Sequence, residues 1–121
     1  MTWASEAWVL VAEGETGSEE ARAMADRQLH QNPSDPTALL LRALSLMVCA
    51  QWSAALTAFS ILFEQHPEFD ERAYFWAAQC RVELSDATGA VRCLSKYLAL
   101  CPQSVSALLW RGQLYGKLSA G

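Results

Sequence analysis

The chain has 121 residues, and 52% of them are apolar, which excludes a disordered chain and is enough for a hydrophobic core. Thirteen acidic and nine basic residues give a net charge of −4, and no two basic residues are adjacent. Because nucleic-acid-binding surfaces need clustered Lys and Arg, this pattern argues against a nucleic-acid partner. The longest apolar stretch, 37–50, contains Arg42 and is shorter than the roughly 20 residues that a membrane span needs. We therefore expect one globular domain, residues 1–121, without membrane insertion.

Residues 1–6 lack the positive charge that begins a signal peptide, which favours a cytoplasmic protein. Four cysteines are present without a C-x-x-C pair: Cys49, Cys80, Cys93 and Cys101. Only two histidines could join them as ligands, so the sequence predicts no metal site and no cofactor. We expect all four thiols to be small buried apolar groups in a reducing compartment.

Helix caps, apolar spacing and prolines predict seven helices in chain order, at about 2–13, 18–31, 36–49, 52–65, 70–84, 87–100 and 104–118. After the turn 14–17, Ser18 is the predicted N-cap of the second helix. Asp35 is the predicted N-cap of the third, with Pro36 at its first helical position. This third helix is apolar nearly all round apart from Arg42 and Ser45, so neighbours must cover it on more than one side.

Three prolines recur along the chain at Pro33, Pro67 and Pro102, separated by 34 and then 35 residues. An alanine stands twelve residues before each proline: Ala21, Ala55 and Ala90. A residue that fills the adjoining space stands eight before each: Ala25, Phe59 and Leu94. The extra residue of the second interval falls either in the turn 67–71 or near Ser85, so positions in the fifth helix are ambiguous by one.

This period and spacing resemble the tetratricopeptide repeat (TPR), a 34-residue helix-turn-helix unit. The resemblance implies an all-α TPR solenoid wound as a right-handed superhelix. Its repeats would cover about 2–34, 35–68 and 69–103, followed by a C-terminal capping helix at about 104–118. Leu108, Gly112 and Tyr115 match the large, small and aromatic spacing of the family in that helix. Arg42 and Arg111 depart from the family, because leucine is usual at their positions.

In this family the first helix of each repeat lines a concave groove that binds extended or helical peptides. The resemblance therefore implies a partner-binding groove whose residues come from four helices: Trp3, Glu6, Leu10, Thr37, Leu40, Leu44, Met47, Tyr74, Phe75, Ala78, Arg81, Leu109 and Gln113. In the fifth helix the alternatives are Tyr74 or Phe75, Ala78 or Gln79, and Arg81 or Val82. Glu13 and Ser106 occupy further groove positions.

The centre of this predicted groove is apolar, which suits a hydrophobic segment of another protein. Heat-shock co-chaperones of the family place lysine, asparagine and arginine there to bind a C-terminal carboxylate. Here the key places hold Glu6, Leu10, Leu40 and Leu44, so we expect that carboxylate clamp to be missing. The alternative for Leu40, Leu44 and Met47 is that they pack against the N-terminal helix as core. Replacing Leu44 or Tyr74 by Asp distinguishes groove from core. Loss of client binding in a folded monomer would identify a groove residue, whereas loss of helicity would identify a core residue.

A narrower resemblance covers residues 74–90, where Tyr-Phe-Trp-Ala-Ala-Gln-Cys is followed by Leu-Ser-Asp and Gly-Ala. This stretch is similar to the third repeat of bacterial type III secretion chaperones, which hold translocator subunits in the cytoplasm before export. Smaller chaperones of needle subunits and export components in the same systems also have this fold. The resemblance implies a chaperone that covers a hydrophobic segment of an exported subunit, as a homodimer or in a heterocomplex.

The alternative is a generic TPR scaffold or adaptor that joins folded partners through outer or edge surfaces such as Trp110. An enzyme is not expected, because the sequence has no nucleophile–base pair, metal-ligand cluster or glycine-rich phosphate loop. The pair Leu109 and Trp110, on a helix whose outer face should be polar, favours self-association or a partner at that face.

Overall fold

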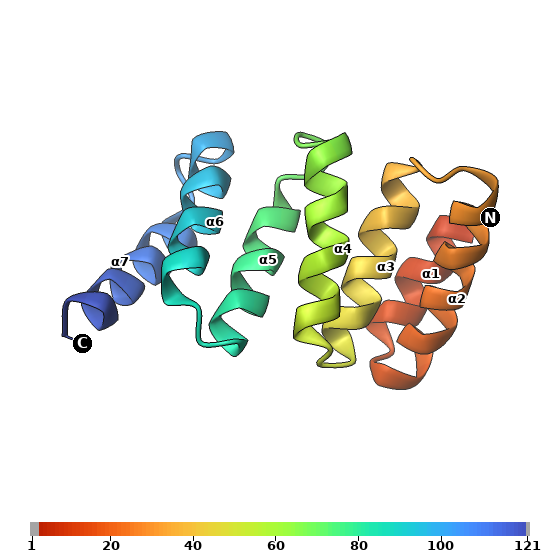
Figure 1. Cartoon of the computed structure of the whole chain (residues 1–121), viewed down its shortest axis with the longest axis horizontal. Coiled ribbons are helices and arrows are strands. Elements are labelled where there is room, and N and C mark those ends of the chain that lie inside the picture. The colour runs from red at the N-terminus through yellow and green to blue at the C-terminus, as the bar shows by residue number, and fades with distance from the viewer. Residues whose placement is uncertain (1–2, 121) are drawn as a thin grey trace. The chain divides into compact units, whose positions relative to one another are not determined.

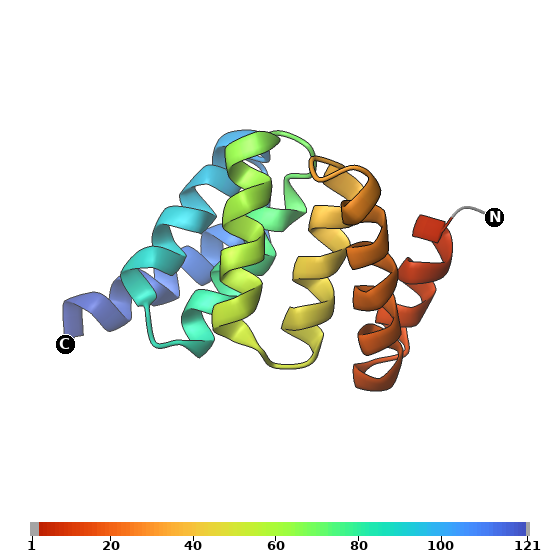
Figure 2. The same cartoon turned by 45° about the vertical axis from the view of Figure 1, so that its right-hand side comes forward.

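The computed structural model describes residues 3–120, which form seven α-helices and no strand. The helices are α1 (Trp3–Ala12), α2 (Glu15–Gln31), α3 (Pro36–Val48), α4 (Trp52–Gln65), α5 (Arg72–Glu83), α6 (Ala87–Leu100) and α7 (Val105–Ala120) (Figure 1). Short turns join consecutive helices, which run antiparallel to one another in α1–α4 (Figure 2). All seven predicted helices are present. The predicted start of the first helix, Thr2, lies outside the described residues.

The chain divides into two compact units, an N-terminal unit of residues Met1–Phe69 and a C-terminal unit of residues Asp70–Gly121. The N-terminal unit holds α1–α4, and the C-terminal unit holds α5–α7. The division falls in the loop between α4 and α5. A single domain over residues 1–121 stays a prediction.

In the N-terminal unit, α3 is the central helix and packs against α1, α2 and α4. Eight of its thirteen residues are buried, which confirms that the nearly all-apolar helix is covered on several sides. Ala7, Ala21, Ala25, Ala38 and Leu41 form one core cluster, and each is 0% exposed. The small alanines let α1, α2 and α3 approach closely, so their backbones pack with little space between them.

The small and large residues that precede each proline are core residues, as the spacing predicts. Ala21, Ala55 and Ala90 are all 0% exposed. Their partners four residues later are also 0% exposed: Ala25, Phe59 and Leu94. Burying Phe59 and Leu94 contributes about 1.5–3 kcal/mol each relative to leaving them exposed, so the repeated pattern encodes part of the core.

Two of the helix starts are capped by aspartate. Asp35 accepts hydrogen bonds from the backbone N–H groups of Thr37 (3.0 Å) and Ala38 (3.4 Å), and Pro36 occupies the first turn, as predicted. Asp86 accepts one from the N–H of Gly89 (2.9 Å) at the start of α6. Each such cap stabilises a helix by about 1 kcal/mol, because it pairs a donor that the helix leaves unsatisfied.

The predicted N-cap at Ser18 is wrong. Helix α2 begins three residues earlier, at Glu15, after Gly14 turns the chain with a φ of 96°. The N–H of Ser18 already donates to the carbonyl oxygen of Gly14 (2.9 Å), which is a bond of the helix itself. Ser18 therefore lies inside the first turns of α2, where its side chain is buried and its Oγ has no hydrogen-bond partner among the described residues.

The extra residue of the second interval lies in the loop 66–71, which resolves the ambiguity in α5. Loops 32–35 and 101–104 have four residues each, whereas loop 66–71 has six. One of these two extra residues is the insertion, and the other is loop because α5 begins one residue later in its repeat than α3. The turns 49–51 and 84–86 are equal in length, and Ala50 and Ser85 both have a positive φ near 60°. With these turns aligned, Leu40 of α3 corresponds to Phe75 of α5.

In the C-terminal unit, α6 lies against both α5 and α7. Its core consists of small and branched apolar residues: Ala78, Ala90, Val91, Leu94, Leu98, Ala107 and Leu114. Phe75, Tyr97 and Trp110 are partly buried against this cluster. The expectation of four buried cysteines is wrong, because only Cys80 is buried and the other three are half-buried: Cys49 and Cys101 at helix ends and Cys93 within α6.

Candidate partner-binding site

Four residues of the predicted groove are closed to solvent in the structure. Leu40 is 2% exposed, Leu44 3%, Tyr74 5% and Ala78 0%. They were groove candidates because of their positions in the repeat, but their apolar character also suits a packed core. These four residues are therefore buried in the free chain, and their role in binding stays a prediction.

Arg81, another predicted groove residue, is engaged in the turn between α5 and α6. Its Nη1 donates to Oδ2 of Asp86 at 2.8 Å, and the same carboxylate caps α6. When the two turns are aligned, the groove position that the sequence left between Arg81 and Val82 belongs to Val82. The position left between Ala78 and Gln79 belongs to Gln79. Both Gln79 and Val82 are half-buried.

The other predicted residues remain accessible to a partner, and their role in binding stays a prediction. Glu6, Leu109 and Gln113 are exposed. The half-buried members of the set are Trp3, Leu10, Thr37, Met47 and Phe75. Trp3 and Leu10 also pack against the core of the N-terminal unit, so only part of each side chain is available.

Within the C-terminal unit, Phe75 lines a pocket of about 310 Å³ between α5, α6 and the start of α7, called the aromatic pocket below. Its lining residues are Arg72, Phe75, Trp76, Tyr97, Ser104 and Ser106. Phe75 and Ser106 are predicted groove positions, and the fold brings them to one cavity. The volume is at the lower end of the range that holds a small ligand or a few side chains.

Aromatic packing fixes the wall of this pocket. The Phe75 ring meets Tyr97 edge-on, with centroids 5.4 Å apart, and meets Trp110 at 5.1 Å in a tilted arrangement. Such pairs contribute about 0.5–1.5 kcal/mol beyond burial, because the ring edge of one faces the electron-rich face of the other. Trp110, a predicted outer-surface contact, is therefore at least partly a structural neighbour of Phe75.

Charge at the rim of the aromatic pocket is largely neutralised. Arg72 forms a two-pronged ion pair with Asp70, with Nη2–Oδ2 at 2.7 Å and Nε–Oδ1 at 3.0 Å. Burial tends to raise the pKa of Asp70, but the hydrogen bonds from Arg72 outweigh it and leave this pKa below its usual range. The Arg72 guanidinium also lies over the Trp76 ring, 5.1 Å from its centroid. The pocket therefore presents aromatic surface and two serine side chains rather than a free charge.

Sequence reasoning missed four lining residues: Arg72, Trp76, Tyr97 and Ser104. Trp76 follows Phe75 directly, and a helix turns by about 100° per residue, so both rings reach one cavity only because the cavity is wide. Tyr97 belongs to a second helix of a repeat, which the groove pattern did not consider. A signal was present in the aromatic run 74–76, which is unusual on a helix that also needs alanines for packing.

Among residues 3–120 the structure brings together no group of three or more His, Cys, Asp or Glu side chains that could hold a metal ion. No helix in this described part combines the length and the apolarity that crossing a membrane requires.

Comparison with known proteins supports the repeat architecture. Residues 72–104 match the sequence profile of the tetratricopeptide repeat family. The first TPR of Spaghetti (RPAP3), solved bound to the HSP90 peptide SRMEEVD, matches with a TM-score of 0.79 and 17% identity over 96% of this chain and 95% of that one. The chain has the tetratricopeptide-repeat fold. No curated protein sequence matches it.

Two of the similar TPR structures are of one secretion chaperone. SycD, the type III secretion translocator chaperone of Yersinia enterocolitica, matches with a TM-score of 0.75 and 16% identity over 98% of this chain and 79% of that one. SycD in complex with a peptide of the translocator YopD matches with the same score and identity, over 98% and 88%. In TPR terms, α5 and α6 are the third repeat, and the aromatic pocket lies beside the capping helix α7.

Proposed function

We propose that this chain is a protein-binding TPR module that acts as a cytoplasmic bacterial chaperone. Its client would be a hydrophobic segment of a type III secretion subunit, either a translocator, a needle subunit or an export component. The action is stoichiometric binding without chemistry: the module covers an aggregation-prone segment and releases it at export.

The observation that carries this proposal is the aromatic pocket. Phe75, Trp76 and Tyr97 offer rigid aromatic surface, which takes an apolar side chain at low entropic cost. The pairing of Arg72 with Asp70 leaves no free charge at the rim that would select an acidic ligand. Support also comes from the sequence of residues 74–90 and from the likeness in fold to SycD.

A role in binding an acidic C-terminal peptide is less well supported, although the similar TPR of Spaghetti (RPAP3) was solved with an HSP90 peptide. The clamp positions hold an exposed Glu6, a half-buried Leu10 and the buried leucines of α3. A carboxylate placed there would meet hydrocarbon and a like charge, both of which oppose its binding.

The test is co-expression with the proteins encoded by neighbouring genes, followed by measurement of the solution mass. We expect a soluble one-to-one complex with one small neighbour that is insoluble alone. Ser106→Trp should abolish the complex, because Ser106 is an exposed residue at the pocket rim and an indole there fills the cavity without disturbing the core. Ser119→Trp, at an exposed position near the end of the same helix, is the matched control.

Circular dichroism establishes that both variants stay helical. A complex that survives Ser106→Trp unchanged places the client elsewhere and refutes the pocket. A stable monomer that binds no neighbouring gene product refutes the chaperone role.

The alternative, a TPR scaffold, is favoured by a different observation. Helix α7 exposes several large apolar side chains, among them Val105 at 67% and Leu109 at 64%. An unpaired apolar helix face of this kind is typical of an interaction surface. Loss of partner binding in Leu109→Glu, with binding kept in Ser106→Trp, would assign the partner to this face.

A further inference from the structure

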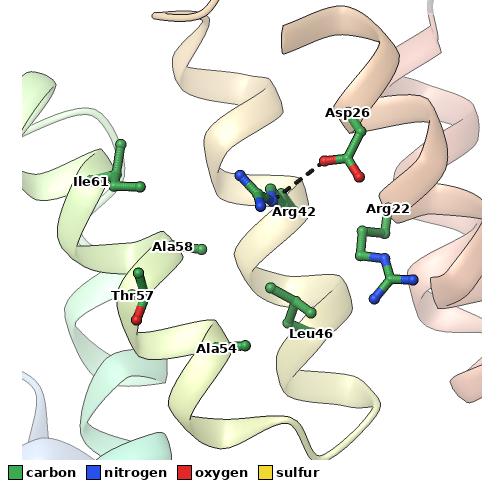
Figure 3. A pocket seen from close by; sticks show the side chains of 8 residues that line it. All are labelled: Arg22, Asp26, Arg42, Leu46, Ala54, Thr57, Ala58 and Ile61. Carbon is green, nitrogen blue, oxygen red and sulfur yellow. Dashed lines mark ion pairs between the residues drawn. The ribbon is translucent and has the colours of Figure 1, made fainter. Parts of the chain in front are cut away.

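A second cavity lies in the N-terminal unit, between α2, α3 and α4, and is called the arginine pocket below (Figure 3). It encloses about 440 Å³ and has eight lining residues: Arg22, Asp26, Arg42, Leu46, Ala54, Thr57, Ala58 and Ile61. None of these residues belongs to the predicted groove. A neighbouring hollow of about 350 Å³ shares Asp26 and Arg42 with it and adds Leu29 and His30.

The arginine pocket opens on the face of α3 opposite to the predicted groove positions. Arg42 lies midway in sequence between Leu40 and Leu44, which places it about 200° around the helix from each. The pocket is therefore separate from the groove positions of α3. It also shares no residue with the aromatic pocket, which belongs to the C-terminal unit.

The lining is divided into a charged side and an apolar side (Figure 3). Arg22 and Asp26 come from α2 and Arg42 from α3, and the Nε of Arg42 lies 3.3 Å from Oδ1 of Asp26. Leu46, Ala54, Ala58 and Ile61 form the opposite side, mostly on α4. The Thr57 hydroxyl donates to the carbonyl oxygen of Ser53 (3.2 Å), so this side offers little polarity to a ligand.

The charges do not balance within the arginine pocket. Arg22 and Arg42 carry two positive charges against the single carboxylate of Asp26, in a chain whose net charge is −4. Arg22 has no ion-pair partner among the described residues, and its side chain reaches toward Leu46 (Figure 3). One positive charge is therefore left over beside an apolar wall.

The pairing of Arg42 with Asp26 is not needed for helix packing. Arg111 of α7 stands at the equivalent position in the C-terminal unit, and its Nη1 donates to Oγ of Ser95 on α6 at 3.2 Å. Ser95 corresponds in the repeat to Asp26, so in the C-terminal unit a neutral hydroxyl accepts the arginine that a carboxylate accepts in the N-terminal unit. The Asp26–Arg42 pair is also partly exposed, at 47% and 42%, and exposed pairs of this kind contribute little to stability.

We propose that the arginine pocket binds an acidic side chain of a partner protein together with an aliphatic residue a few positions away in the same segment. The carboxylate would be held by Arg22 and Arg42, because guanidinium groups bind carboxylates in a two-pronged geometry. The aliphatic residue would contact Leu46, Ala54, Ala58 and Ile61. This is a second protein-binding site, in the other unit of the chain, and it goes beyond the proposed chaperone function.

The test uses the full chain labelled with ¹⁵N and the capped peptide acetyl-Glu-Ala-Ala-Leu-amide, followed by NMR titration. We expect shifts at the Arg22 and Arg42 side-chain Nε–H groups and at the amides of Ala54 and Ala58. Replacing Glu by Gln in the peptide should weaken binding about fivefold, the size expected for an exposed charge pair. Replacing Leu by Ala should weaken it as well, and added salt should weaken only the Glu peptide.

Arg22→Gln and Arg42→Gln should each weaken the Glu peptide about threefold or more, because each removes one of the two cations. Arg27→Gln, on an exposed part of the same helix outside the pocket, is the matched control and should change nothing. Equal binding of the Glu and Gln peptides, shifts located elsewhere, or no binding at about 10 mM peptide would each overturn the proposal. Ser106→Trp should leave this titration unchanged, so failure here is distinguishable from failure of the chaperone proposal.

Discussion

Replacing Gly17 by alanine should destabilise the protein, although alanine is normally the better helix residue. Gly17 is buried in the first turns of α2, where α1 crosses it closely. A Cβ built there would overlap the carbonyl oxygen of Leu10 and lie 2.9 Å from its carbonyl carbon. Both atoms are backbone, so α1 itself must move to make room. Overpacking of this kind costs about 1–3 kcal/mol, whereas Gly to Ala in a helix gains about 0.5–1 kcal/mol.

The net expectation for Gly17→Ala is a loss of up to about 2.5 kcal/mol in the free energy of unfolding. Urea denaturation followed by circular dichroism at 222 nm measures it. Gly112→Ala is the matched control, because Gly112 also lies within a helix but a Cβ added there would meet no atom within 4 Å among the described residues. That control should be neutral or gain up to about 1 kcal/mol. A gain of the same size in both variants would refute the close approach of α1 and α2.

The remaining predictions concern burial and charge. Leu44→Asp should lose helical signal and about 4 kcal/mol or more of stability, because it buries a carboxylate at a position that is 3% exposed; a folded variant with full helicity would contradict the core assignment. The hydrogen bond from Gly89 and the ion pair with Arg81 lower the pKa of Asp86, so its stabilising effect relative to Asp86→Asn should be complete above about pH 4 and disappear as the pH falls below its folded pKa. Burial raises the pKa of the Cys80 thiol to about 11, and Cys80 is 0% exposed, so it should be the slowest of the four thiols to react with iodoacetamide at pH 8; rapid labelling without unfolding would contradict this.

The helices could be predicted from the sequence because their signals are local. Asp35 and Asp86 cap helices through side chains two or three residues away, and each repeated alanine is buried where the spacing places it. Ser18 misled the prediction, since a serine before two glutamates has the composition of a cap but Gly14 had already turned the chain. The apolar pattern does not indicate where a glycine has a positive φ, so it could not predict that α2 begins directly after Gly14.

The candidate site was less predictable, because it depends on which apolar residues a packed helix leaves uncovered. Leu40, Leu44 and Phe75 have the same hydrophobic character, yet the leucines are closed and Phe75 lines a cavity. The difference comes from neighbours that are distant in sequence, such as Tyr97 and Ser104 beside Phe75. The register of α5 was also undetermined until the lengths of loops 32–35 and 66–71 could be compared.

Residues that depart from the repeat pattern say more about binding than residues that match it. The matching alanines and their partners are 0% exposed, so they encode packing and are inaccessible to a ligand. Arg42 and Arg111, which replace the usual leucine, both reach a side chain on the preceding helix, at Asp26 and Ser95. Arg42 also has a second cation, Arg22, beside an apolar wall. In the C-terminal unit, the arginine in place of leucine therefore makes a structural contact. In the N-terminal unit, it also gives a cavity a charged wall. The arginine pocket is therefore the one to test with an acidic peptide.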